Sequence, residues 1–308
     1  MDIKPHISIV SPIYKAENFI NKLVFEIEKA MVILDVDYEI ILVDDRSKDS
    51  SWQKMKELSL NNSNIKSIRL SRNFGQHPAI MAGLSQAKGE WIVVMDCDLQ
   101  DQPKEIVKLY NKAQEDFEIV QARRKNREDS FLKKLSSKLF SKIYGYFTDT
   151  KYDNEIANFG IYHKKVIDSI CEISDYIKFF PLFIDFVGYK SASIVVEHAP
   201  RESGTTSYSF SKLVSLAFNT IISFSNKPLK LFVKFGMTIS LISFCVGIYY
   251  IYQALHNEIE VLGYTSIIVS IWFLSGIIMT MIGVTGIYIG KIFDQTKNRP
   301  VYIIDEII

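Results

Sequence analysis

Residues 91–103 read Trp-Ile-Val-Val-Met-Asp-Cys-Asp-Leu-Gln-Asp-Gln-Pro, an apolar run that changes abruptly into carboxylates. The five apolar residues at its start predict a buried β-strand. Side chains alternate between the two faces of an extended chain, so we expect Asp96, Asp98 and Gln100 to share one face. Cys97 and Leu99 are then expected to point back into the core.

The oxygens of Asp96, Asp98 and Gln100 form a candidate site for Mg²⁺ or Mn²⁺. Hard oxygen ligands suit these ions, which usually bind through one or two carboxylates together with substrate phosphates. That preference excludes Cys97 as a ligand. A structural alternative is that the Asp-x-Asp pair caps the helix that Pro103 begins. From these residues alone both interpretations stand.

Strand and helix patterns alternate through the first half of the chain. Apolar strands are predicted at 7–12, 38–43, 65–70, 91–95 and 119–122, and helices at 17–34, 50–58 and 78–87. This alternation is typical of an α/β fold with a mostly parallel sheet. Ligands of such sheets bind at the carboxyl ends of the strands, which here are residues 12–14, 44–45 and 96–98.

The motifs of two common α/β nucleotide-binding classes are absent from the sequence. It contains no Gly-x-Gly, so it lacks the fingerprint of dinucleotide-dependent oxidoreductases. It also lacks the Gly-Lys-Ser/Thr of phosphate-loop hydrolases. A net charge of +1 argues against nucleic acid as a partner.

The chain divides into a globular part and an apolar part. Overall it is 48% hydrophobic and 23% charged, which is ordinary for a globular protein of 308 residues. Residues 235–252 and 261–290, however, carry no formal charge, and about 20 apolar residues suffice to cross a bilayer. We therefore predict a globular domain at 1–207, a juxtamembrane amphipathic helix at 208–230, two transmembrane helices within 231–290 (about 235–253 and 264–288) and a C-terminal tail at 291–308.

Basic residues flank the two apolar segments on their outer sides, whereas the connector carries only two glutamates. Basic flanks stay in the cytoplasm, so we expect both termini and the globular domain at the cytoplasmic face of the inner membrane. The first residues show no signal-peptide pattern, and three scattered cysteines fit a reducing compartment. The flanking residues are Lys227, Lys230, Lys234, Lys291, Lys297 and Arg299.

Two further stretches are amphipathic. Residues 131–147 mix apolar side chains with lysines, as expected either of a helix lying on an anionic membrane or of a solvated helix packed on the domain. Residues 208–224 run into the first apolar segment. We expect this second stretch to seat the globular domain on the bilayer.

Taken in order, the motifs resemble those of inverting family 2 glycosyltransferases with the GT-A fold, specifically the branch that acts on polyprenyl phosphates. They span nearly the whole chain, and the ordered set is far more specific than one Asp-x-Asp. The matching pieces are Pro12-Ile13-Tyr14, 43–49, Ser71-Arg72-Asn73-Phe74-Gly75, 95–101, Arg201-x-x-Gly204, Tyr288-Ile289-Gly290 and Arg299-Pro300-x-Tyr302.

The resemblance implies a role for each matching site residue. Asp44 and Asp45 would lie near the base and ribose of a nucleotide sugar, and Asp96, Asp98 and Gln100 would hold Mg²⁺ or Mn²⁺ on its diphosphate. The arginines would bind anionic phosphates, which suits their planar, permanently charged fork. The implied nucleotide-binding residues are Pro12, Tyr14, Glu17, Asp44, Asp45 and Asp96, and the implied catalytic residues are Asp98, Arg124, Arg127 and Arg201.

Four positions depart from the family pattern. Lys15-Ala16 stands in place of Asn-Glu, which leaves Glu17 as the acidic residue there. Arg46 replaces the glycine of Asp-Asp-Gly-Ser, and Ala157-Asn158-Phe159-Gly160 replaces Gly-Asp-Phe-Arg. The motif that starts at Arg201 lacks a lysine. We expect sugar preference to differ through these positions.

The resemblance implies inverting transfer of one sugar from a UDP- or GDP-linked donor to a polyprenyl (undecaprenyl) phosphate at the cytoplasmic membrane face. The product would be a lipid-linked sugar for cell-envelope glycan or lipopolysaccharide modification, made by a homo-oligomer that relatives suggest is a tetramer. Two alternatives are a processive polysaccharide synthase and a non-catalytic scaffold that binds nucleotide sugars. No tryptophan of the chain follows an arginine, so the Gln-x-x-Arg-Trp motif of such synthases is missing.

Overall fold

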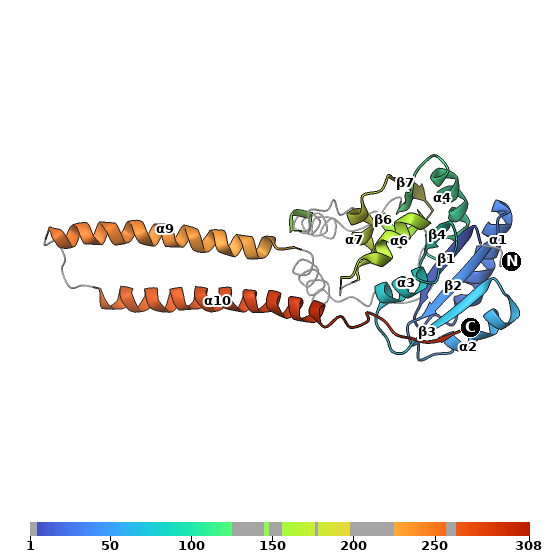
Figure 1. Cartoon of the computed structure of the whole chain (residues 1–308), viewed down its shortest axis with the longest axis horizontal. Coiled ribbons are helices and arrows are strands. Elements are labelled where there is room, and N and C mark those ends of the chain that lie inside the picture. Colours follow the sequence, from blue (N-terminus) through green and yellow to red (C-terminus); the bar gives the residue numbers. More distant parts are fainter. Residues whose placement is uncertain (1–4, 125–144, 148–155, 176–177, 198–224, 257–262) are drawn as a thin grey trace. The chain divides into compact units, whose positions relative to one another are not determined.

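An eight-stranded sheet forms the centre of the first of two units (Figure 1). The computed structural model describes residues 5–124, 145–147, 156–175, 178–197, 225–256 and 263–308. In the sheet the strands follow the order β7-β5-β6-β4-β1-β2-β3-β8. They are β1 (Ile7–Ile13), β2 (Tyr38–Asp44), β3 (Ile65–Leu70), β4 (Trp91–Val94), β5 (Ile119–Arg124), β6 (Ile156–His163), β7 (Ser191–Val196) and β8 (Ile304–Ile307).

The strand directions bring several carboxyl ends to one edge of this sheet. We call it the functional edge, because the candidate site residues follow these strand ends. β1 pairs in parallel with both β2 and β4, and β2 pairs in parallel with β3. β6 runs antiparallel to both β4 and β5, so β4 and β5 point the same way. The carboxyl ends of β1 to β5 therefore meet at one edge. The five predicted strands are confirmed; β1 and β2 are each one residue longer at their ends, β4 is one residue shorter and β5 is two residues longer.

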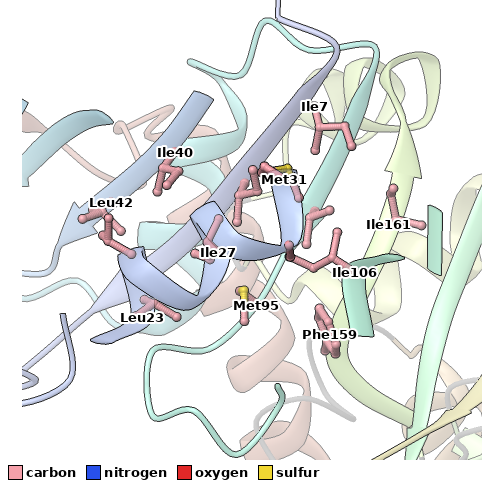
Figure 2. Close-up of a cluster of buried hydrophobic side chains, with 14 of the residues drawn as sticks. Ile7, Leu23, Ile27, Met31, Ile40, Leu42, Met95, Ile106, Phe159 and Ile161 are labelled. Carbon is pink, nitrogen blue, oxygen red and sulfur yellow. The ribbon is translucent and has the colours of Figure 1, made fainter. Parts of the chain in front are cut away.

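Helices cover both faces of the sheet. α1 (Ile20–Leu34) presents Leu23, Ile27 and Met31 at helical spacing to Ile7 and its neighbours on the sheet (Figure 2). The opposite face receives α3 (Gln76–Leu84), where Gly83 lies directly over β1 and β2. The remaining elements of this unit are α2 (Ser51–Asn61), η1 (Pro103–Glu105), α4 (Ile106–Ala113), α6 (Lys164–Glu172) and α7 (Phe180–Val187).

The C-terminal end of the chain forms part of the same sheet. Residues 299–308 belong to the first unit, and β8 pairs antiparallel with β3 at the sheet's edge. Residues 291–308 were predicted to form a C-terminal tail, with no strand in it. A four-residue strand has too short a pattern to be recognised without knowledge of its partner strand.

The second unit contains two long helices, α9 (Lys227–Leu255) and α10 (Tyr264–Thr296). Both extend beyond the predicted spans, and each contains a segment long and apolar enough to cross a membrane, at Lys227–Val246 and Ser270–Thr296. The hydroxyl of Tyr288 on α10 donates to the carbonyl of Ser225, two residues before α9, at 2.8 Å. This hydrogen bond connects the start of α9 to the C-terminal half of α10.

Candidate active site

The turn that follows β4 carries the Asp-x-Asp motif at the functional edge. β4 ends at Val94, and residues 97–100 form a turn in which Leu99 has a left-handed backbone with φ 59°. The expected extended alternation through Gln100 is therefore wrong, because the chain bends before it could alternate. The expected sorting of side chains nevertheless holds: Leu99 is buried in the core, while Asp96, Asp98 and Gln100 are partly exposed.

The two carboxylates of this turn are held by different elements. Asp96 Oδ1 accepts a hydrogen bond from Nε2 of Gln76, the first residue of α3, at 2.7 Å. Asp98 Oδ1 accepts from the backbone N–H of Gln100 at 3.2 Å, within the turn itself. Gln76 was not a predicted site residue. It lies 20 positions from Asp96 in the sequence, so no local pattern indicates this contact.

The donor set of this turn fits a divalent cation that shares a diphosphate. Within the parts of the chain that the structure describes, no three His, Cys, Asp or Glu side chains are grouped to hold a metal ion. Mg²⁺ and Mn²⁺ do not need such a cage, because one or two carboxylates and the oxygens of a substrate phosphate suffice. Asp96 and Asp98 would provide those carboxylates, and Gln100 would add an amide oxygen.

Cys97 has the properties of a core residue. It packs against the hydrophobic core, and burial, assisted by the charges of Asp96 and Asp98, raises the pKa of its thiol to about 12. A thiol binds metal as the thiolate, which a pKa this high suppresses near neutral pH. That Cys97 is not a ligand stays a prediction, which rests on the preference of Mg²⁺ and Mn²⁺ for oxygen.

Asp44 and Asp45 hold loops together at the end of β2. Asp44 has no exposed surface; its Oδ1 accepts from Ser47 N–H at 2.9 Å, and its Oδ2 lies 3.4 Å from Arg69 Nε. Asp45 accepts from the backbone N–H groups of Phe74 at 2.7 Å and Gly75 at 2.8 Å. Burial raises the pKa of Asp45, and these two hydrogen bonds oppose that rise.

Both carboxylates of this acidic pair have structural partners, and their predicted nucleotide contacts stay predictions. Asp45 joins the end of β2 to the residues that lead into α3. α3 in turn begins with Gln76, which contacts Asp96. The two acidic motifs are therefore linked through the start of one helix.

The segment after β1 is attached to the segment after β2. Lys15 N–H donates to Ser47 Oγ at 3.0 Å, and Ala16 N–H donates to Ser51 Oγ at 3.1 Å. Glu17 Oε2 accepts from Ser50 N–H at 2.9 Å, at the start of α2. Glu17 thus stabilises a helix N-terminus, which favours negative charge. Its predicted nucleotide contact is untested.

Pro12 and Tyr14 differ in their exposure at this edge. Pro12 is buried within β1, whereas Tyr14 is 45% exposed just beyond it. Tyr14 is therefore accessible for contact, whereas the ring of Pro12 supports the segment from within the strand. The nucleotide contacts predicted for both residues stay predictions.

Two more residues reach the same edge from β5 and β6. Arg124 is the last residue of β5. Gly160 of β6 pairs with Val94 of β4, and the two strands are antiparallel. Asn158, two residues before Gly160, therefore lies beyond the end of β4, beside the turn that carries Asp96. Arg127 and Arg201 lie outside the described residues, as do Gly204, most of 131–147 and all of 208–224.

His77 on α3 adds a half-buried imidazole next to Gln76. Its ring contacts Phe179 edge to face, with ring centroids 4.6 Å apart. Burial lowers the pKa of His77 to about 4, so the ring is neutral near pH 7. The sequence offered no periodic or motif signal for this pair.

Comparison with known proteins gives the family of the chain. The model of glycosyl transferase family 2 matches residues 8–171. An uncharacterized glycosyltransferase of Synechocystis sp. is 33% identical over 98% of this chain and 95% of its own length. The undecaprenyl-phosphate 4-deoxy-4-formamido-L-arabinose transferase of Proteus mirabilis is 30% identical over 98% of this chain and 94% of its own length.

Solved structures show the same fold at low sequence identity. The mannosyl-3-phosphoglycerate synthase of Rubrobacter xylanophilus superposes with a TM-score of 0.51 at 13% identity, covering 71% of this chain and 72% of that one. The glucosyl-3-phosphoglycerate synthase of Mycobacterium tuberculosis, solved with Mn²⁺, UDP-glucose and phosphoglyceric acid, gives 0.51 at 14% identity, covering 71% and 78%. With its GT-A sheet and two C-terminal candidate membrane helices, the chain belongs to glycosyl transferase family 2.

Proposed function

We propose that this protein transfers one sugar, with inversion, from a nucleotide sugar to a polyprenyl phosphate such as undecaprenyl phosphate at the cytoplasmic face of a membrane. One observation carries the proposal: the same chain joins an Asp-x-Asp turn at the functional edge of a GT-A sheet to two helices of membrane-spanning length. The Proteus mirabilis relative supports the proposal. Its name specifies transfer to undecaprenyl phosphate, and it matches this chain along nearly the full length of both proteins.

On the donor side, Asp96, Asp98 and Gln100 would hold Mg²⁺ or Mn²⁺ against the diphosphate of the nucleotide sugar. The bound cation would neutralise the charge that develops on the departing nucleoside diphosphate. Tyr14 is exposed at the same edge and can contact the base. The Mycobacterium tuberculosis neighbour, crystallised with Mn²⁺ and UDP-glucose, supports such a site on this fold.

On the acceptor side, the position beside the Asp-x-Asp turn holds an amide rather than a carboxylate. Transfer to a hydroxyl requires a base, which contributes about 10²–10⁴-fold. A phosphate monoester is already ionised at neutral pH and needs cations to orient it. Asn158 is therefore compatible with a phosphate acceptor, and Arg124, Arg127 and Arg201 are the residues we propose to bind it.

In the membrane, α9 and α10 would form a hairpin with both ends in the cytoplasm, as the flanking lysines predict. The two helices expose many large apolar side chains, among them Met237, Trp272 and Met279. Lipid or neighbouring subunits would cover these side chains. We propose a homo-oligomer, with four subunits as the expected number.

The decisive experiment offers labelled UDP-, GDP- and dTDP-sugars, each with undecaprenyl phosphate, to the purified full chain in lipid vesicles with Mg²⁺ or Mn²⁺. We expect label in the lipid fraction for one donor. Undecaprenol, which lacks the phosphate, serves as the matched acceptor. Efficient transfer to undecaprenol or to a free sugar would contradict a phosphate acceptor, and no transfer from any donor would favour the scaffold alternative.

A further inference from the structure

The strand at the C-terminal end of the chain reaches the functional edge of the sheet. β8 runs antiparallel to β3, so it begins where β3 ends: Ile304 pairs with Leu70. Just before it, the carbonyl of Ile303 accepts from Ser71 N–H at 2.9 Å. The Tyr302 hydroxyl donates to Ser85 Oγ at 3.1 Å, at the far end of α3.

Asp305 of β8 forms an ion pair with Arg46, in the turn after β2. The Arg46 Nη1 and Asp305 Oδ2 atoms are 2.5 Å apart, across 259 positions of sequence. Arg46 adopts a left-handed backbone with φ 58°. L-residues with a side chain are disfavoured in that conformation, whereas glycine adopts it freely. The chain nevertheless has an arginine here, and its side chain contacts Asp305.

The neighbours of Arg46 hold the other two segments of the donor side. Asp45, immediately before it, accepts from Phe74 and Gly75 N–H and so fixes the entry to α3. Ser47, immediately after it, accepts from Lys15 N–H and so fixes the segment after β1. Restraining the residue between them restrains both connections.

We propose that Arg46 and Asp305 are positioning residues of the donor site, through which the C-terminal strand fixes the turn that connects the segments after β1, β2 and β3. The inference rests on the proposed function, because it takes these segments to surround a nucleotide sugar. Neither residue needs to touch the donor. Their ion pair is partly exposed, with side chains 40% and 47% accessible, so its effect should be moderate.

The test compares Asp305→Ala with Glu306→Ala in the full chain. Glu306 is the next residue of β8, but its carboxylate pairs with Lys56 of α2 at 3.3 Å and not with the turn. Losing an exposed ion pair of up to about 1 kcal/mol corresponds to a change of up to about fivefold. We expect Asp305→Ala to raise the KM for the nucleotide sugar about twofold to fivefold at unchanged kcat, and Glu306→Ala to leave both unchanged.

Substitutions of Arg46 separate positioning from stability. Arg46→Gly removes the left-handed cost and the ion pair together, so we expect an unfolding temperature no lower than that of the parent but the same rise in KM. Arg46→Lys keeps a cation for this single N–O contact, so its KM should equal that of the parent chain. If KM changed only where the unfolding temperature fell, or if Asp305→Ala and Glu306→Ala behaved alike, the pair would be a surface ion pair and the proposal would be overturned.

Amide hydrogen exchange gives a readout that does not depend on the proposed reaction. Exchange of residues 44–51 should become faster in Asp305→Ala than in Glu306→Ala, with or without any activity. Unchanged exchange in an active enzyme refutes the positioning role alone. Faster exchange in a chain that transfers no sugar refutes the proposed function and retains the structural link.

Discussion

At the residue scale, the two aspartates of the turn after β4 are not equivalent. Asp96 is tied to the start of α3 through Gln76, whereas the hydrogen bond of Asp98 Oδ1 closes its own turn. Removal of Asp96 therefore disturbs a helix as well as the proposed cation site. We therefore test the chemistry at Asp98.

We predict that Asp98→Ala lowers sugar transfer at least about 100-fold, a typical loss when one group that stabilises transition-state charge is removed. Asp98→Asn should lose nearly as much, because it keeps the shape and removes the charge. Thermal unfolding should change little, since Asp98 is partly exposed. Near-normal transfer by the alanine variant in the presence of EDTA would contradict the metal assignment.

Burial of His77 predicts a pH dependence of stability. The pKa of this imidazole is about 4 in the folded chain and about 6.5 when exposed, so the unfolded chain binds the extra proton between these values. Stability should therefore fall as the pH drops below about 6.5. The limiting slope for one proton is about 1.4 kcal/mol per pH unit, and the ring is only partly covered, so we expect a smaller slope.

The measurement is thermal unfolding of the full chain between pH 5 and pH 7, with His77→Gln as the comparison. The variant should show a flatter profile over this range, because glutamine does not titrate. Other acidic and basic groups contribute equally to both proteins. Equal slopes in the two proteins would show that His77 titrates normally.

At the element scale, the sequence was sufficient wherever the pattern is local. Strands β1 to β4 and helix α1 were predictable because their apolar residues repeat within a few positions. The left-handed turn at Leu99 was not, because no glycine marks it. Nor was β8, whose partner strand lies more than 230 positions earlier in the chain.

The site was predictable by residue type but not by partner. The motifs located Asp44, Asp45, Asp96 and Asp98 at strand ends, and the structure places all four at one edge of the sheet. They could not indicate that Asp45 would hold the backbone of Phe74 and Gly75. Such bonds depend on how closely α3 approaches the end of β2, which is a property of packing.

Packing of α3 on the sheet gives a prediction with an unusual sign. A Cβ at Gly83 would lie 2.4 Å from Val10 Cγ1 and 3.1 Å from Val43 Cγ2. Although alanine normally favours a helix over glycine by about 1 kcal/mol, we expect Gly83→Ala to destabilise the fold by about 1–3 kcal/mol through overpacking. Denaturant unfolding measures this difference.

The double variant Gly83→Ala with Val10→Ala provides the control, because it removes the closest contacting methyl group. Gly83→Ala should therefore cost less stability in the Val10→Ala background than in the parent chain. Additive losses in the double variant would show that the two residues do not compete for the same space. The position of α3 over β1 would then need another explanation.

At the scale of the whole molecule, apolar and basic residues occupy different parts of the last third of the chain. The two long helices carry apolar side chains along their lengths, while basic residues gather at the outer ends. The chain returns after α10 to complete the sheet with β8. We therefore predict that both outer ends of the helical pair lie on the side of the membrane that holds the sheet.

This topology predicts that the connector between α9 and α10 faces away from the sheet. The connector carries Glu258 and Glu260 and no basic residue, so it lacks the charges that retain a loop in the cytoplasm. A cysteine introduced as Asn257→Cys should react with a membrane-impermeant maleimide added to intact cells. Ser63→Cys, at an exposed position of the sheet unit, should react only after permeabilisation. The reverse pattern would place the sheet outside, and labelling of both positions only after permeabilisation would mean that α9 and α10 do not cross the membrane.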